Sequence, residues 1–257
     1  MPFPSTKPAF VTSTLITATH GFFGSEGGVS TGRFSSLNTG LQVNDDPQAV
    51  AQNRAIVAGA MDVAPEKFAI LKQVHGPDCF TITNGQWPGA ETQGDALVTD
   101  QPGVAIGVLS ADCVPVLFEA EGVVGAAHAG WGGAVKGVLE NTIAAMKKLG
   151  AQNIRAAVGP AIAHKSYEVS HGFEKPFVAE DESAVAFFTP AATQGKWLFD
   201  LPGYCAFRLK RAGIEAIDIL DIDAYPENSG YFSHRRASLK GEPTPGRQVS
   251  AISLKRA

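Results

Sequence analysis

The sequence feature that most constrains the fold is a predicted hairpin of two apolar runs within residues 107–133. The runs Val114–Phe118 and Val123–Ala127 are short, rich in valine and separated by a polar turn at Glu121 and Gly122. Short, continuous apolar runs of this kind indicate strands that are buried on both faces. The hairpin is therefore expected in the interior of the protein, with other elements packed on each side of it.

The rest of the chain mixes strand and helix patterns around this hairpin. Further strands are predicted at residues 11–23, 68–75, 79–83, 95–99, 104–109, 154–158, 214–220 and 248–254. Helices are predicted at residues 47–60, at 134–149, at 170–188 with an interruption at Pro176, and from Asp200 to Gly213. The two kinds of element do not alternate strictly, which argues against a purely parallel sheet. We expect one domain over residues 1–257, with residues 1–10 as an extended arm.

Composition narrows the functional classes. Hydrophobic residues make up 44% of the 257 residues, enough for a large core, and the net charge of −4 gives no reason to expect a nucleic-acid partner. No stretch of about 18 apolar residues is present, so no membrane partner is expected. The first residues lack the apolar run of a signal peptide, and three cysteines do not suggest a disulfide framework. We therefore expect a cytoplasmic protein with reduced thiols.

Three residues form a candidate metal site. Cys113 directly precedes the first strand of the hairpin and His128 follows the second, so strand pairing brings them to the same end. His75 ends another predicted strand, in LKQVHGP. Two histidines and one cysteine suit zinc with a fourth position open for water or substrate, as in catalytic zinc sites. Each residue alone also fits a structural role, as a buried thiol or a hydrogen-bonded histidine, but the three together favour a metal.

Two neighbours of these residues are candidate catalytic groups. Asp112 precedes Cys113, and we expect it to transfer a proton or to orient a metal ligand. Gln73 precedes His75 by two positions, so on a strand both side chains would share one face, where Gln73 would bind substrate or orient the site. The structural alternatives are a turn-capping aspartate and an ordinary polar residue of a strand.

A series of motifs runs along nearly the whole chain in a recognisable order. They are HGFF, GGVS, SLN, NR, QVHG, DALVTD, ADCVPVLF, AHAGW, VGPAI, YEV, FDL, FSHRR and GR. In this order the chain resembles the YfiH-type family, also called the laccase-domain or multicopper polyphenol oxidoreductase family. The resemblance implies an α+β fold in which two mixed β-sheets pack together and are flanked by helices. It also implies that His75, Cys113 and His128 bind the metal.

The activity that the resemblance implies is that of a zinc-dependent purine nucleoside enzyme. Such an enzyme phosphorolyses adenosine, inosine and methylthioadenosine, and deaminates adenosine, so its partners are a purine nucleoside and phosphate. Asn38 and Arg54 lie in family motifs and are candidate pocket residues. Arg236 and Arg247 have the forked donors that suit phosphate, and Trp131 is a candidate to stack on a purine. Each of these five residues also has an ordinary structural alternative. Asn38 could cap a turn, the arginines could be surface charges, and Trp131 could be a core residue. The sequence predicts no particular oligomeric state.

Three other functions remain open at the level of sequence. Two histidines and a cysteine also make a blue-copper ligand set, so Cu²⁺ and polyphenol oxidation are an alternative. The histidine-rich trinuclear cluster of a laccase is not evident, because the six histidines include no HxH pair. Cys113 and His128 could instead act without metal as a hydrolase, for example on peptidoglycan precursors. A metal-stabilised binding module without turnover is the third alternative.

Overall fold

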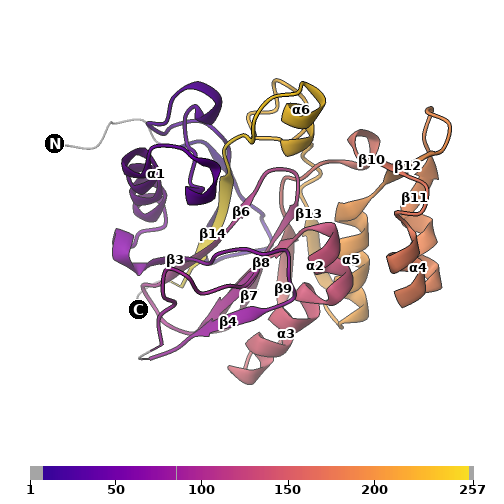
Figure 1. Ribbon diagram of the computed structural model, residues 1–257. Helices are drawn as coiled ribbons and strands as arrows, with labels where there is room; N and C mark the ends of the chain where they lie inside the picture. Colours follow the sequence, from indigo (N-terminus) through magenta and orange to yellow (C-terminus); the bar gives the residue numbers. More distant parts are fainter. Residues whose placement is uncertain (1–7, 85, 255–257) are drawn as a thin grey trace.

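Two mixed β-sheets lie face to face at the centre of the computed structural model, which describes residues 8–84 and 86–254 (Figure 1). The six-stranded sheet has the order β13 (Ala216–Ile219), β9 (Arg155–Val158), β7 (Val114–Ala120), β8 (Val123–Ala129), β5 (Ala96–Thr99) and β4 (Cys79–Ile82). The five-stranded sheet has the order β1 (Phe10–Val11), β2 (Thr19–Phe23), β14 (Gln248–Ser253), β6 (Ala105–Ser110) and β3 (Phe68–Ile70). Each sheet contains parallel and antiparallel pairs.

The strands of the predicted hairpin are buried on both faces because alternate side chains enter different cores. In β7, Val116 and Phe118 pack on the helices outside the six-stranded sheet. Leu117 points the other way and packs between the sheets, with Ile106 of β6 and Ile252 of β14. This alternation explains why β7 is apolar on both faces from Val114 to Phe118.

Helices cover the two outer faces, as Figure 1 shows. The outer face of the five-stranded sheet is covered by α1 (Pro47–Ala60), through Val57 and Ala58. The outer face of the six-stranded sheet is covered by α3 (Val138–Lys148) and α5 (Leu201–Arg211). The predicted α+β fold, with two packed mixed sheets flanked by helices, is confirmed. Within residues 8–84 and 86–254, no helix combines the length and the apolar character that crossing a bilayer requires.

A smaller aromatic lobe was not expected from the sequence. A three-stranded sheet contains β10 (Glu168–Ser170), β12 (Lys196–Phe199) and β11 (Phe188–Pro190), and α4 (Lys175–Glu180) packs beside it. Clustered aromatic rings hold it together, for example Phe177 and Phe199, whose centroids are 4.7 Å apart. Short 3₁₀ segments occur at Gly32–Phe34, Leu41–Val43, Pro65–Lys67, His164–Ser166 and Glu182–Phe187.

Two predicted strands are shorter in the structure. Of residues 11–23, only the ends join β1 and β2, because Glu119 accepts hydrogen bonds from the N–H groups of Thr17 and Ala18 and holds that segment away from the ladder. The predicted strand 68–75 ends at Ile70. The arm predicted at residues 1–10 lies mostly outside the described residues, and Phe10 begins β1.

Two helix predictions also differ from the structure, and one short helix was not predicted. The helix expected at 134–149 is two helices, α2 (Trp131–Lys136) and α3, separated at Gly137, whose φ of +92° favours glycine. Pro176 lies in the first turn of α4, where a missing N–H costs nothing, and so does not interrupt a longer helix. The helix that was not predicted is α6 (His234–Leu239), which begins after an N-cap at Ser233.

Replacing Leu117 by alanine should lower the free energy of unfolding by about 2–5 kcal/mol. The leucine side chain fills space between the two sheets, and its removal would leave a cavity there. The measurement is urea unfolding followed by circular dichroism. Val185→Ala is the control, since Val185 is 56% exposed and its truncation should change the free energy of unfolding by less than about 0.5 kcal/mol. Equal effects of the two substitutions would contradict the packing described here.

Candidate metal centre

His75, Cys113 and His128 meet at one end of the β7–β8 hairpin. Their candidate ligand atoms all lie within 4.8 Å of one another, and Cys113 Sγ is 4.0 Å from His75 Nε2. Cys113 directly precedes β7, and in the paired strands His128 lies opposite Pro115. His75 lies in the loop after β3. The centroid of its ring is 4.9 Å from that of the His128 ring, and the two ring planes are nearly perpendicular, at 82°. Strand pairing thus sets two of the three positions, and a separate loop supplies the third.

A glycine makes room for the chain to pass over this cluster. A Cβ atom on Gly130 would lie 2.9 Å from His75 Cδ2 and 3.2 Å from Cys113 Sγ. Only glycine therefore allows the turn from β8 into α2 to approach so closely.

The cluster favours a thiolate at Cys113. Burial alone would raise the pKa of the thiol, but the charges and hydrogen bonds of His128 and His75 outweigh burial and lower it to about 6. Burial would likewise lower the pKa of His128, but the Cys113 thiolate and the Asp95 carboxylate raise it to about 9. Thiolate sulfur and imidazole nitrogen are donors that zinc prefers, so these side chains fit a zinc ion in both kind and spacing.

The carboxylate that orients His128 is Asp95, which sequence reasoning missed. Asp95 Oδ1 lies 2.8 Å from His128 Nδ1, so His128 presents Nε2 to the cluster. The one feature of the sequence that could have pointed to this role is the position of Asp95, an acidic residue directly before the apolar strand β5. Asp112 Oδ2 accepts the N–H of Arg235 at 2.6 Å and so anchors α6, and among the described residues no hydrogen bond joins the Asp112 side chain to a candidate metal ligand. Burial raises the pKa of Asp112, and its Oδ1 has no hydrogen-bond partner among the described residues.

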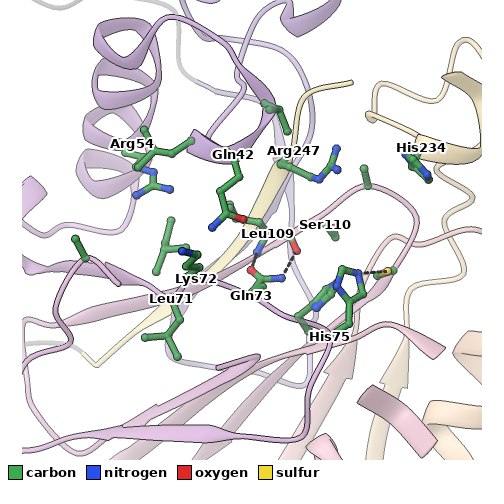
Figure 2. A pocket seen from close by; sticks show the side chains of 18 residues that line it. Gln42, Arg54, Leu71, Lys72, Gln73, His75, Leu109, Ser110, His234 and Arg247 are labelled. Atoms are coloured by element: carbon green, nitrogen blue, oxygen red, sulfur yellow. Dashed lines mark hydrogen bonds between the residues drawn. The ribbon is translucent and has the colours of Figure 1, made fainter. Parts of the chain in front are cut away.

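Two cavities adjoin the cluster, and His75, Cys113 and His234 line both. The first cavity, about 380 Å³, has polar and cationic walls (Figure 2). Its polar and charged lining residues are Gln42, Arg54, Lys72, Gln73, Ser110 and Arg247. The second cavity, about 470 Å³, has aromatic and apolar walls that include Trp131, Tyr167, Ile162, Leu201 and Leu239, and it also contains Asp112 and Arg235.

Arg54 and Arg247 are half-buried cations in the first cavity without a carboxylate partner. Arg54 Nε donates to the carbonyl of Thr39 at 2.9 Å, and Arg247 Nη1 donates to the carbonyls of Pro245 and Gly246. Among the described residues neither arginine forms an ion pair. Burial lowers the pKa of both, that of Arg54 to about 10. Such a pair of poorly hydrated cations fits a bound anion.

Arg236 and Asn38 have structural roles in this arrangement. The Arg236 guanidinium donates to four carbonyls and lies outside both cavities, so it is not available there as the predicted phosphate donor. Those carbonyls belong to Ala224, Tyr225, Pro226 and Tyr231. Asn38 is fully buried and accepts the backbone N–H of Arg247 at 2.8 Å, so it positions that residue and does not line either cavity.

Gln73 and Trp131 both line cavities. Gln73 is not on a strand shared with His75, because β3 has already ended and His75 has a φ of +58°. The Gln73 amide exchanges two hydrogen bonds with the backbone of Leu109, at 2.6 and 2.8 Å, which fixes the side chain in the wall of the first cavity (Figure 2). Trp131 is 44% exposed in the second cavity and packs on Phe173 with centroids 5.1 Å apart.

The chain is similar in sequence to curated bacterial proteins. It is 38% identical over 230 residues to a protein of Escherichia coli (strain K12) named purine nucleoside phosphorylase YfiH, covering 89% of this chain and 90% of that one. It is 37% identical over 247 residues to a purine nucleoside phosphorylase of Deinococcus radiodurans, covering 92% of this chain and 89% of that one.

Solved structures share the fold of this chain, and a family model matches most of its length. Neisseria meningitidis protein NMB0706 matches with a TM-score of 0.84 at 34% identity, over 96% of this chain and 99% of that one. YlmD from Geobacillus stearothermophilus matches with a TM-score of 0.83 at 28% identity, over 97% and 100%. The model of the family described as multi-copper polyphenol oxidoreductase laccase matches residues 19–255. The chain therefore belongs to this laccase-domain family, which is the family of YfiH.

Proposed function

We propose that this protein is a zinc-dependent purine nucleoside enzyme that phosphorolyses adenosine, inosine and methylthioadenosine and also deaminates adenosine. The observation that carries the proposal is the pair of arginines, Arg54 and Arg247, which line the same cavity as His75 and Cys113 and form no ion pair with any described residue. An anion-binding wall beside a candidate metal centre suits phosphate as co-substrate. The names of the curated relatives support the nucleoside as the other substrate.

The two cavities suggest how the substrates are divided. Phosphate would bind Arg54 and Arg247 in the first cavity, while the purine would stack on Trp131 or Tyr167 in the second. In phosphorolysis a phosphate oxygen bonds to the ribose C1′ while the bond from C1′ to the purine nitrogen breaks. The purine nitrogen keeps the bonding electrons and needs a proton. Asp112, buried in the wall of the second cavity, is the proposed donor.

Zinc fits the donor set of the site. When bound to His75, Cys113 and His128, zinc would supply Lewis-acid polarisation of a substrate group. Asp95 would hold His128 in the tautomer that presents Nε2. The same donors suit a copper ion, and metal analysis distinguishes the two.

Purified protein should contain close to one zinc per chain, and chelation should abolish turnover. With adenosine and phosphate we expect adenine and ribose phosphate; with adenosine alone we expect inosine. Metal content is measured by plasma mass spectrometry and products by chromatography. Metal-replete protein that forms neither product would reject the nucleoside assignment, and copper in place of zinc would favour the oxidase alternative.

Replacing Arg247 or Arg54 by glutamine should raise the KM for phosphate about 10- to 100-fold, because each removes charge-assisted hydrogen bonds worth about 1.5–3 kcal/mol. Deamination of adenosine does not use phosphate and should be little changed. Steady-state kinetics of both reactions make the comparison. Arg33→Gln is the control, since Arg33 is exposed and lies outside the first cavity. Parallel losses in both reactions would show that the arginines do not form a phosphate site.

A metal-free cysteine hydrolase is the second candidate, favoured by the lowered pKa of Cys113 beside His128. In metal-free protein, alkylation of Cys113 by iodoacetamide should be half-maximal near pH 6 and slow below it, because the thiolate is the reactive form. Cys79 should stay unmodified at pH 7, since burial raises the pKa of its thiol to about 12. Peptide mass spectrometry measures both sites. Protection of Cys113 by zinc supports the metal enzyme, whereas hydrolase activity of metal-free protein supports the second candidate.

A further inference from the structure

We propose that Asp95 is the positioning residue of the metal centre: one buried carboxylate fixes the positions of both candidate histidine ligands. The inference rests on the metal site in the proposed function, but it does not depend on which substrate that site takes.

The first link joins Asp95 to His128. Asp95 is fully buried directly before β5, the strand that pairs with β8. Its backbone carbonyl accepts the N–H of His128 at 2.7 Å, and its Oδ1 lies 2.8 Å from His128 Nδ1. Backbone and side chain of one residue therefore hold both the position and the ring orientation of His128.

The second link joins the same carboxylate to the loop that carries His75. Oδ1 accepts the backbone N–H of His75 at 3.0 Å, while Oδ2 accepts those of Val74 at 3.0 Å and Gly76 at 2.8 Å. Three successive N–H groups thus surround one carboxylate, as in backbone nests that bind anions.

Other hydrogen bonds fix the two ends of this loop, at Gln73 and at the carbonyl of Pro77, but not His75 between them. Val74 is 45% exposed and His75 is also exposed, so apolar packing contributes little to their positions. His75 has a φ of +58°, in a region that a non-glycine residue occupies only when its surroundings compensate. The hydrogen bonds to Asp95 provide that compensation, so the carboxylate determines where the His75 ring lies relative to His128.

The test is zinc affinity in Asp95→Asn, which keeps the size of the side chain and removes its charge and two of its acceptor positions. The matched control is Glu119→Gln. Glu119 is also a buried carboxylate, and it accepts the N–H groups of Thr17 and Ala18 at 2.8 and 2.9 Å, away from the metal centre. Competition with a chromophoric chelator on full-length protein gives the Kd for zinc. We expect Asp95→Asn to weaken zinc binding about 10- to 100-fold and Glu119→Gln to leave it within about 2-fold.

Two further readouts separate positioning from simple stability. Cobalt substitution should give a changed visible spectrum in Asp95→Asn but not in Glu119→Gln, although both variants should have lower melting temperatures. If Asp95→Asn does not fold, Asp95→Glu keeps the charge but displaces the carboxylate by one methylene, and it should still weaken zinc binding about 10-fold.

Zinc affinity and cobalt spectra like those of the wild type in the folded Asp95 variant would overturn the proposal and leave Asp95 a purely structural residue. Failure of the wild-type protein to bind zinc would overturn it as well. Wild-type protein that binds zinc but neither phosphorolyses nor deaminates nucleosides would refute the proposed function and leave the role of Asp95 intact.

Discussion

The pairing of β7 with β8 is the constraint on which the rest of the structure depends. Because both strands are buried on both faces, each must have a second sheet on one side and helices on the other. The same pairing places Cys113 and His128 together at the end of the hairpin. Stability and the candidate chemistry therefore arise from one element, and a shift in its register would disrupt both.

Polar groups accumulate where the strands end. The strands themselves bury almost only apolar side chains, whereas the loops beyond them bring in His75, Asp112 and Asp95. Loops on a rigid scaffold can hold buried polar groups when hydrogen bonds satisfy them. Here Asp95 is buried and lines neither cavity, whereas the cations Arg54 and Arg247 line the first cavity, so opposite charges lie in different surroundings.

Sequence reasoning placed Cys113 near His128 because hairpin geometry is local: strand period and turn length suffice to bring the two together. For His75, sequence reasoning relied instead on the end of a predicted strand and on the QVHG motif. It went wrong where side chains bond to distant backbone. Gln73 was assigned to a strand, but its amide pairs with the backbone of Leu109 and β3 ends earlier. Arg236 was predicted to bind phosphate, yet four carbonyls occupy it. Asp95 went unnoticed because its partners lie about 20 to 33 positions away in the chain.

By itself the sequence determined the pattern of strands and helices, the buried hairpin and the candidate donor set, because these follow from the period of apolar residues and from the chemistry of single side chains. Only the tertiary structure decided which carboxylate orients a histidine. It also decided which arginines line the first cavity and which arginine donates its hydrogen bonds to backbone carbonyls instead. Those outcomes depend on hydrogen bonds between segments that are far apart in the chain, and no local pattern encodes the distance between them.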